Sequence, residues 1–232
     1  MNTSKPIVDV VIPAFNEEHS LPHVIQDIPK SEVRCIVVAD NNSIDDTAKV
    51  AKEAGAIVVP ASQQGYGSAC LAGLDFVANQ EHKPDIVVFI DADYSDHPEE
   101  LTQLIAPIIA GKADMVIGSR ALGKREQGSM MPQQIFGNWL ATSLLKMLYG
   151  VSYTDLGPFR AIRYTSLQQL KMKDPNYGWT VEMQLKAARQ KLSIIEIPVS
   201  YRKRIGTSKI AGTLKGTILA GYKIIYTIFK YR

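Results

Sequence analysis

Two aspartates follow a short apolar segment near the middle of the chain. Residues 86–90 read Ile-Val-Val-Phe-Ile, and Asp91, Asp93 and Ser95 come directly after them. A strand buried on both faces of a parallel sheet has this composition, and open α/β sheets bind ligands at the carboxyl ends of their strands. Mg²⁺ and Mn²⁺ bind one or two carboxylates together with substrate phosphates. The spacing therefore predicts a metal site made by Asp91, Asp93 and Ser95.

A structural explanation of the same residues stays open at this point. Aspartates that follow a strand are common in turns and helix caps, and Asp-x-Asp alone is a weak signal. Pro98 is followed by two glutamates and is expected to begin a helix, with Asp96 as its cap. Other segments of the sequence are needed to distinguish a helix cap from a functional site.

Composition limits the classes of protein that the chain can belong to. Its 232 residues are 46% hydrophobic and 21% charged, as expected for one α/β domain. The net charge of +3 is too small to indicate nucleic-acid binding. Cys35 and Cys70 are expected to be buried thiols, and the amino terminus lacks the apolar core of a signal peptide. We therefore expect a cytoplasmic protein without a spanning helix.

Predicted strands and helices alternate through the first half of the chain. The expected strands are 8–12, 35–39, 56–59, 86–90 and 115–117, with helices at 17–28, 45–54, 65–79 and 99–110. This alternation predicts a mainly parallel mixed sheet with helices on both faces. The second half is expected to contain a loop at 121–131, helices at 132–149 and 179–190, strands ending near 163 and 201, a basic loop at 202–209 and a last helix at 211–231.

Polar residues and glycines gather where the predicted strands end. They are Asn16, Glu17, Asp40, Gly65, Gly67, Asp91, Asp93 and Arg120. Carboxyl ends of parallel strands share one edge of a sheet, so these residues are expected to surround one crevice. The glycines would let the backbone approach an anionic ligand at the start of a helix. The segment is neither a dinucleotide fingerprint nor a P-loop, because Cys70 stands at the third glycine position and no Gly-Lys-Ser/Thr follows.

Taken together, these segments resemble the family 2 glycosyltransferases, which have the nucleotide-sugar-binding GT-A fold. The matching segments are Val11-Ile-Pro-Ala-Phe-Asn-Glu17, Asp40-Asn-Asn-Ser-Ile-Asp45, Gln63-Gln-Gly-Tyr-Gly67 and Asp91-Ala-Asp93. The later segments resemble one branch, the polyprenyl- and dolichyl-phosphate sugar synthases. They are Gly118-Ser-Arg120, Asp155-Leu-Gly-Pro-Phe-Arg160 and Arg204-Ile-Gly-Thr-Ser-Lys209. The resemblance covers residues 7 to about 212 and is specific as an ordered set.

The resemblance implies a role for each matching residue. It implies donor binding by Pro13, Asn16, Glu17, Asp40, Gly67, Asp91, Ala92, Arg204 and Lys209. It implies acceptor binding by Arg120, Arg160 and Lys209, catalytic roles for Asp155 and Arg204, and Mg²⁺ or Mn²⁺ as cofactor. The sequence departs from the family at Asn41 and Asn42, where Asp-Gly is usual, at Gln63, where Asn is usual, and at Ser95, where some members of this branch have Gln.

The predicted activity is an inverting transfer of one sugar from a UDP- or GDP-linked donor to a polyprenyl phosphate. Single transfer is expected because the chain lacks the Gln-x-x-Arg-Trp motif of processive synthases. Asp155 is the candidate base, and a turn role before Gly157 is its alternative. A phosphate acceptor is already ionised near pH 7, so Asp155→Asn should nearly abolish transfer only to a hydroxyl acceptor.

The last helix raises the question of a membrane. At 100° per residue, Lys215, Lys223 and Lys230 lie on one side of it. Another side carries Leu214, Ile218, Ile225 and Phe229, with Tyr222 and Tyr226 between the two. We expect residues 1–210 to form the glycosyltransferase domain, with 211–232 either packed on it or lying in the inner face of the cell membrane. Packing would place the lysines in water. A homo-oligomer is left open.

Two other functions remain as alternatives. One keeps the donor but uses a soluble hydroxyl compound or a glycan as the acceptor. The other is a non-catalytic nucleotide-sugar-binding protein, against which the joint presence of Asp91, Asp93, Asp155 and Arg204 argues. A nucleotidyltransferase is expected to have a basic glycine-rich loop after the first strand. This chain has Pro13-Ala-Phe-Asn16 there, which argues against that function.

Overall fold

The protein is built around one seven-stranded sheet. A computed structural model describes residues 5–207 and 214–231. The strand order is β3-β2-β1-β4-β6-β5-β7, and β6 alone runs antiparallel to both of its neighbours. The strands are β1 (Val8–Ala14), β2 (Cys35–Asp40), β3 (Ile57–Pro60), β4 (Ile86–Phe89), β5 (Met115–Ser119), β6 (Arg160–Arg163) and β7 (Ile194–Pro198). The predicted α/β class and mainly parallel mixed sheet are confirmed.

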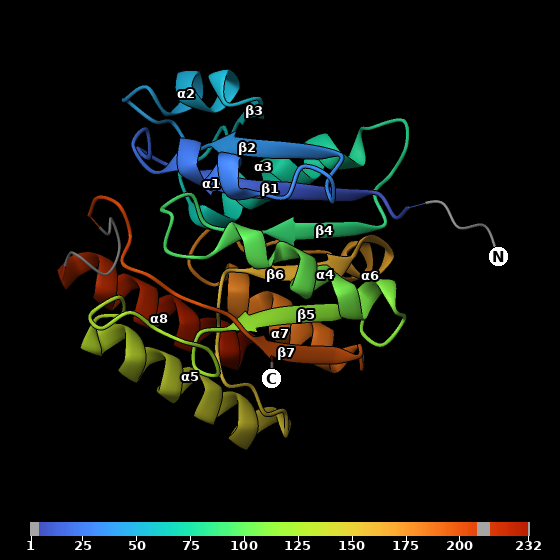
Figure 1. The fold of residues 1–232 in the computed structure, drawn as a ribbon. Coiled ribbons are helices and arrows are strands. Elements are labelled where there is room, and N and C mark those ends of the chain that lie inside the picture. Colours follow the sequence, from blue (N-terminus) through green and yellow to red (C-terminus); the bar gives the residue numbers. More distant parts are fainter. Residues whose placement is uncertain (1–4, 208–213, 232) are drawn as a thin grey trace.

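Helices cover both faces of this sheet (Figure 1). One face carries α1 (Leu21–Asp27), α2 (Thr47–Glu53) and, after the short 3₁₀ turn η1 (Pro98–Glu100), α4 (Leu101–Ile109). The other carries α3 (Tyr66–Ala78), α5 (Pro132–Tyr149), α6 (Tyr164–Leu170), α7 (Trp179–Arg189) and α8 (Leu214–Lys230). No helix in the described ranges is both long and apolar enough to cross a membrane.

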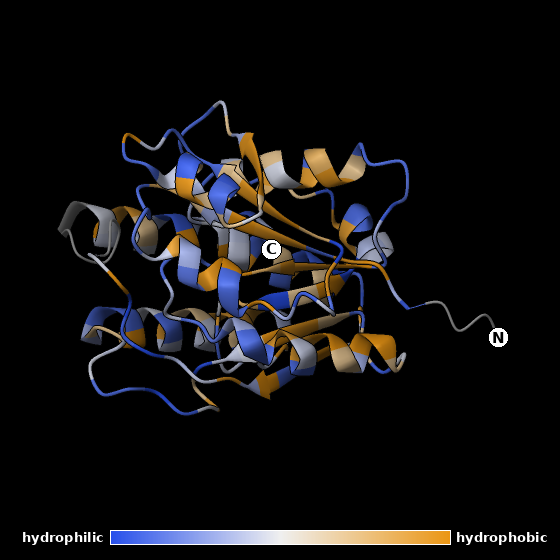
Figure 2. Cartoon of the chain, turned by 45° about the horizontal axis from the view of Figure 1, so that its top comes forward, coloured by the Kyte–Doolittle hydropathy of each residue, from blue (hydrophilic) through white to orange (hydrophobic). Residues whose placement is uncertain are grey.

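Successive side chains of each strand point to opposite faces of the sheet and pack into two apolar cores. Along β1, Val8, Val10 and Ile12 belong to one core, and Val11 belongs to the other. Every residue of β1 and β4 is buried, as expected for two strands whose residues are all apolar except Asp9. Figure 2 shows the strands as the most hydrophobic part of the molecule. Burial on both faces fixes the register of the strands and therefore the edge at which each one ends.

The antiparallel strand β6 brings a third chain segment to the functional edge. Arg160, the first residue of β6, pairs with Phe89 at the end of β4 and with Ile117 of β5. The segment before β6, which contains Asp155, therefore lies beside the residues that follow β4 and β5. A parallel strand in the same place would have put this segment at the opposite end of the sheet.

Several boundaries differ from the sequence-based expectations. The helix predicted from Glu17 begins at Leu21, because residues 17–20 form a turn in which Glu17 O accepts the Ser20 and Leu21 amides. The strand expected to end near 201 stops at Pro198. Helix α6 was not predicted; it is only seven residues long and begins directly after β6 without a turn signal. Asp96 was expected to cap the helix at Pro98, which is wrong, since η1 has no side-chain cap.

The predicted glycine loop contacts the protein's own backbone. An atom added at the Cβ position of Gly67 would lie 1.9 Å from the Asp174 carbonyl oxygen, and one at Gly65 would lie 2.2 Å from that of Pro175. The Ser68 amide donates to Pro175 O at 2.9 Å. These glycines therefore allow the start of α3 to pack closely against residues 174–176, so that both segments form one wall.

Substitution of Gly67 tests this packing. We expect Gly67→Ala to lower the free energy of unfolding by about 2 kcal/mol or more, because backbone must move to admit the methyl group. Gly137→Ala is the matched control, since Gly137 lies within α5 with open space around its Cβ position. The control should be unchanged or gain about 0.5–1 kcal/mol in urea unfolding. Equal stability of the two variants would contradict the packing argument.

Candidate functional site

A cavity of about 400 Å³ opens at the carboxyl edge of the sheet. Residues that follow β1, β2 and β4 line one side of it, and the start of α3 and the segments around 176 and 204 line the rest. The lining residues are Pro13, Ala14, Phe15, Glu17, Asn41, Gln64, Gly65, Tyr66, Ala69, Asp91, Ala92, Asp93, Asn176, Tyr177 and Arg204. Seven of them were predicted to lie at the site: Pro13, Glu17, Gly65, Asp91, Ala92, Asp93 and Arg204.

Asp93 and Arg204 form an ion pair at the cavity wall. The Arg204 guanidinium contacts Asp93 Oδ2, and the side chains are 30% and 4% exposed respectively. The other oxygen, Oδ1, accepts the Ser95 amide at 2.9 Å and the Ser95 hydroxyl. The Ile205 amide donates to the Asp93 carbonyl at 3.0 Å, which fixes the 202–205 segment next to the aspartate. A positive and a negative group thus face the same cavity from two distant parts of the chain.

Asp91 lies on the same wall in a less polar setting. The Tyr66 hydroxyl donates to Asp91 Oδ1 at 3.0 Å. Burial raises the pKa of Asp91, against the hydrogen bond from Tyr66 and the charges of Arg204 and Arg120, which lower it. Burial, followed by the charge of Asp91, also raises the pKa of Tyr66 well above its ordinary value, so the tyrosine remains a donor. A cation beside Asp91 would favour its ionised form.

The donor set of this wall suits a divalent cation only in part. Asp91 and Asp93 supply hard carboxylate oxygens, but the described residues contain no cluster of three or more His, Cys, Asp and Glu side chains around one point. Ser95 is buried, does not line the cavity and donates its hydroxyl to Asp93. It therefore orients a carboxylate, and the residues fit an ion that takes its other ligands from a bound phosphate.

Asn41 connects the end of β2 to the glycine loop. Its side-chain Nδ2 donates to Gln63 O at 2.7 Å, and its Oδ1 accepts the Gly65 amide at 2.7 Å. An aspartate could make the second bond but not the first. The amide at this departure from the family pattern thus fixes the cavity wall in a way that a carboxylate could not.

The cavity includes residues that the sequence did not single out as site residues. Gln64 and Tyr66 belong to the Gln63–Gly67 segment, of which the sequence analysis singled out only the two glycines. Asn176 and Tyr177 come from the segment before α7, which follows no strand and carries no recognisable motif. Tertiary contacts place them here, among them the packing of Gly65 and Gly67 against residues 174–175.

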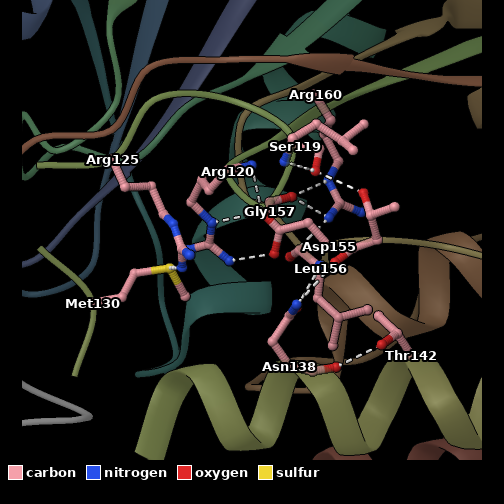
Figure 3. A network of polar contacts seen from close by, with 12 residues as sticks. Ser119, Arg120, Arg125, Met130, Asn138, Thr142, Asp155, Leu156, Gly157 and Arg160 are labelled. Atoms are coloured by element: carbon pink, nitrogen blue, oxygen red, sulfur yellow. Dashed lines mark hydrogen bonds and ion pairs between the residues drawn. The ribbon is translucent and has the colours of Figure 1, made fainter. Parts of the chain in front are cut away.

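Asp155 is held by Arg120 in a bidentate ion pair (Figure 3). Arg120 Nε and its backbone amide donate to Asp155 Oδ2, and Nη2 donates to Oδ1, all at 2.8 Å. Asp155 is 1% exposed and Arg120 12%. Burial raises the pKa of Asp155, but the charge and hydrogen bonds of Arg120 lower it by more, so the net shift is downward. A carboxylate in this state holds a proton weakly and is a poor base.

A network of neutral and charged groups fixes the segment that carries Asp155. Glu196 of β7 accepts the Thr154 and Asp155 amides at 2.9 Å and 3.2 Å, and Gln184 donates to Asp155 O at 3.0 Å. Asn138 of α5 donates to Thr154 O and accepts the Leu156 amide (Figure 3). The backbone on both sides of Asp155 is therefore bonded to three other elements.

Arg160 was assigned to the acceptor, but the structure places it elsewhere. It is fully buried, and its guanidinium donates to the carbonyl oxygens of Leu156, Gly157 and Thr180. Burial lowers its pKa to about 10, which still leaves it charged at neutral pH. The side chain links the Asp155 segment to α7 and does not line the cavity.

The other predicted residues lie around the cavity without lining it. Asn16 Oδ1 accepts the Ile44 amide at 2.9 Å, and Asp40 Oδ1 accepts the Ser43 amide at 3.4 Å, so both shape the loop after β2. Gly67 is buried against Asp174 O. Lys209, predicted for both donor and acceptor, lies outside the described residues.

Asp96 is a buried carboxyl that lies behind this edge. It is 1% exposed, and neither side-chain oxygen has a hydrogen-bond partner in the described structure. Burial, followed by the charge of Asp91, raises its pKa to about 8. The group is therefore largely protonated at neutral pH, which avoids an unpaired negative charge beside Asp91 and Asp155.

Asp155→Asn should destabilise the protein strongly. The substitution leaves the Arg120 guanidinium buried without its counter-charge, and we expect a loss of about 3–5 kcal/mol at pH 7. Because the pKa of Asp155 is lowered by folding, its stabilisation is present above about pH 4 and disappears as the pH falls further. Urea unfolding of both proteins between pH 7 and pH 3 should show the difference shrinking only at the acidic end.

Asp114→Asn provides the matched control, since Asp114 pairs with Arg163 at 3.5 Å with side chains 32% and 37% exposed. We expect this change to cost less than about 1 kcal/mol, as exposed pairs do. A loss at Asp155 no larger than at Asp114 would contradict the buried-pair argument. The same destabilisation must be separated from any loss of proton transfer when Asp155 variants are assayed.

Comparison with known proteins agrees with this geometry. The model of glycosyl transferase family 2 matches residues 9–171. An uncharacterized glycosyltransferase of Mycobacterium tuberculosis is 38% identical over 215 residues, which cover 92% of this chain and 94% of that protein. The undecaprenyl-phosphate mannosyltransferase of Micrococcus luteus is 29% identical over 221 residues, 89% of this chain and 88% of that enzyme.

The fold is shared with a solved enzyme. A crystal structure of glucosyl-3-phosphoglycerate synthase from Mycobacterium tuberculosis in complex with Mn²⁺, UDP-glucose and phosphoglyceric acid superposes with a TM-score of 0.77. It is 24% identical and the match covers 97% of this chain and 79% of that one. The sequence-based recognition is confirmed: this chain is a glycosyltransferase that belongs to family 2 and has the GT-A fold.

Proposed function

We propose that this glycosyltransferase moves a single sugar, with inversion, from a nucleoside-diphosphate sugar to a polyprenyl phosphate at a membrane surface. The observation that carries the proposal is the cavity at the sheet edge, where Asp91 and Asp93 face Arg204. Carboxylates and a guanidinium around one space suit a metal-bound diphosphate, because each charge on the ligand finds its opposite.

The donor's nucleoside would lie over the ends of β1 and β2. Pro13 and Glu17 line this part of the cavity, and Asn41 fixes its floor through Gln63 and Gly65. Asp40 would act on the base through the loop that it orders. The diphosphate would then reach Asp91 and Asp93 at the end of β4. Uridine and guanosine donors both remain within the proposal.

Asp91 and Asp93 would hold Mg²⁺ or Mn²⁺ together with the diphosphate oxygens. A divalent ion bound there would stabilise the negative charge of the departing nucleoside diphosphate as a Lewis acid. Ser95 keeps Asp93 oriented toward the cavity, and Tyr66 does the same for Asp91. Arg204, which contacts Asp93 in this structure, would turn its charge to a phosphate, as arginine's planar fork permits.

The state of Asp155 favours an acceptor that arrives already ionised. Its carboxylate is bonded on both oxygens to Arg120 and has a lowered pKa, so it is poorly suited to take a proton from a hydroxyl group. A phosphate monoester carries its negative charge without help near pH 7. The name of the Micrococcus luteus relative, an undecaprenyl-phosphate mannosyltransferase, supports the same acceptor class.

The outer surface of α5 and α8 supports a membrane location. The two helices lie side by side at the lower part of Figure 1, far from α2. Large apolar side chains on them are 37–70% exposed: Ile135, Phe136, Trp139 and Met147 on α5, and Ile218, Leu219, Tyr222, Ile225, Tyr226 and Phe229 on α8. Simple packing of α8 was expected to place its lysines in water, yet Lys223 pairs with Asp174 while Ile218 is 61% exposed. An exposed apolar face with aromatic side chains suits a lipid surface.

The decisive experiment measures transfer of labelled sugar. Purified protein would be given UDP-glucose, UDP-GlcNAc or GDP-mannose with Mn²⁺ or Mg²⁺ and polyprenyl phosphate, followed by organic extraction. We expect labelled product in the organic phase with one of the donors, and none after the metal is chelated. In Asp93→Asn transfer should fall at least 100-fold, because the metal bound to the diphosphate loses a carboxylate ligand. Glu99→Gln, an exposed acid on η1, should transfer normally.

Label that stays in water would support the rival acceptor class. The solved relative in fold was crystallised with phosphoglyceric acid, so a soluble phosphorylated acceptor is the first alternative to try. Transfer to such a compound, with none to polyprenyl phosphate, would overturn the lipid part of the proposal and leave the donor part standing.

Membrane association can be tested separately from transfer. Sedimentation with vesicles of phosphatidylglycerol and phosphatidylethanolamine should carry the protein down, and Phe136→Ser/Trp139→Ser should reduce the bound fraction several-fold through loss of apolar burial. Ile44→Ser is the control, because Ile44 is 92% exposed but lies in the loop before α2. A stable dimer in solution, with no vesicle binding, would assign the face to a second copy instead.

A further inference from the structure

The inner side of α8 contacts the segment that forms one wall of the cavity. Asn176 and Tyr177 line the cavity, and Asp174 lies directly before them. Asp174 is 8% exposed, and its Oδ2 lies 3.0 Å from Lys223 Nζ in the middle of α8. The exposed face of α8 and the donor cavity are therefore separated by one ion pair and a short loop.

Asp174 uses its other oxygen to shape that loop. Its Oδ1 accepts the Asn176 amide at 2.8 Å and the Gly178 amide at 3.3 Å. The carboxylate is thus the centre around which residues 174–178 turn. Without Lys223, this nearly buried carboxylate would lack its partner charge and would be drawn toward water, taking the loop with it.

The same loop also supports the glycine segment at the start of α3, with which it forms one wall. The carbonyl oxygens of Asp174 and Pro175 fit against Gly67 and Gly65, and the Ser68 amide donates to Pro175 O. A displacement of the loop would therefore move the start of α3 as well, so that both segments of this wall would change together. Because the packing there is backbone against backbone, side-chain adjustment could not absorb the movement.

Further contacts from α8 and the chain end reach the same segment. Thr227 is buried, and its hydroxyl lies within 2.5 Å of where a Cβ of Gly178 would be, so only glycine fits at 178. The Tyr231 hydroxyl donates to Glu182 Oε1, and Glu182 Oε2 accepts the Asp174 amide at 2.7 Å. Lys223 and Thr227 therefore contact the loop directly, and Tyr231 supports it through Glu182.

We propose that Lys223 is a positioning residue for nucleotide binding, which acts by holding Asp174 and with it the Asn176–Tyr177 wall of the cavity. The inference rests on the proposed function, since it takes the cavity as the donor site. It adds that α8 contributes to donor affinity, in addition to any contact with lipid.

The test compares Lys223→Met with Lys223→Arg and with Lys146→Met in the full-length chain. Methionine keeps the apolar stem and removes the charge, whereas arginine restores it. Lys146 is exposed on α5, so its substitution removes the same charge from the neighbouring helix. Calorimetry would measure binding of UDP and of GDP in the presence of Mn²⁺, and amide hydrogen exchange would follow residues 173–178 without nucleotide.

We expect Lys223→Met to weaken binding of the preferred nucleotide about fivefold or more, within the range of coupled sites. The Asn176 and Gly178 amides should exchange faster in this variant, and both properties should return to near wild-type values in Lys223→Arg. Lys146→Met should match the wild type. In the transfer reaction the donor KM should rise while kcat changes little, a pattern that general loss of structure would not produce.

Unchanged nucleotide affinity and unchanged exchange in Lys223→Met would overturn the proposal. If Lys223→Met does not fold, Asp174→Asn replaces it, because asparagine keeps the oxygen that accepts the Asn176 and Gly178 amides but loses the charge that Lys223 meets. Failure of the wild type to bind either nucleotide would instead remove the proposed function, and with it the role of Lys223, even if the exchange result held.

Discussion

Pairing of charges at the end of a largely apolar sheet is the constraint that organises this protein. Strands β1 and β4 carry no polar side chain that could share the charge of the residues after them, apart from Asp9 at the opposite end of β1. Three acids at the carboxyl edge have a partner: Arg204 pairs with Asp93, Arg120 pairs with Asp155, and the Tyr66 hydroxyl donates to Asp91. Asp96, which has no partner, has a raised pKa instead. Buried charges demand such partners, and the partners come from segments far away in the sequence.

The Arg120–Asp155 and Arg204–Asp93 ion pairs differ in burial, which indicates a structural role for the first and a ligand-binding role for the second. The Arg120–Asp155 pair is almost fully buried and bidentate, and its backbone is bonded to three further elements. The Arg204–Asp93 pair borders the cavity, and Arg204 retains 30% of its side-chain exposure. Breaking the Arg120–Asp155 pair would cost much free energy, so this pair stabilises the carboxyl edge of the sheet. The second can be exchanged for contacts with a ligand, because water and ligand reach the guanidinium.

The sequence predicted the sheet and half of the site for identifiable reasons. Apolar runs such as 86–90 and the alternation with helices define the strands, and strand ends define the edge, so Asp91 and Asp93 were found. Arg160 looked like a phosphate ligand because its motif is known, but nothing in the motif says that three carbonyl oxygens surround it. Asn176 and Tyr177 could not be predicted, because a backbone contact between Gly67 and Asp174 brings them to the cavity.

The sequence pattern of helix α8 could not predict which of its sides contacts the domain. Its lysines and its isoleucines lie on different sides, which fits either a water-facing or a lipid-facing helix. The structure places Lys223 against a buried acid and Ile228 in the core, while Ile218 and Phe229 on the same helix stay exposed. That orientation follows from Asp174, an acid whose position the sequence does not connect with α8. A helix that contacts the domain through Lys223 and Ile228, and leaves other apolar side chains exposed, is suited to link a surface-bound state to the cavity behind it.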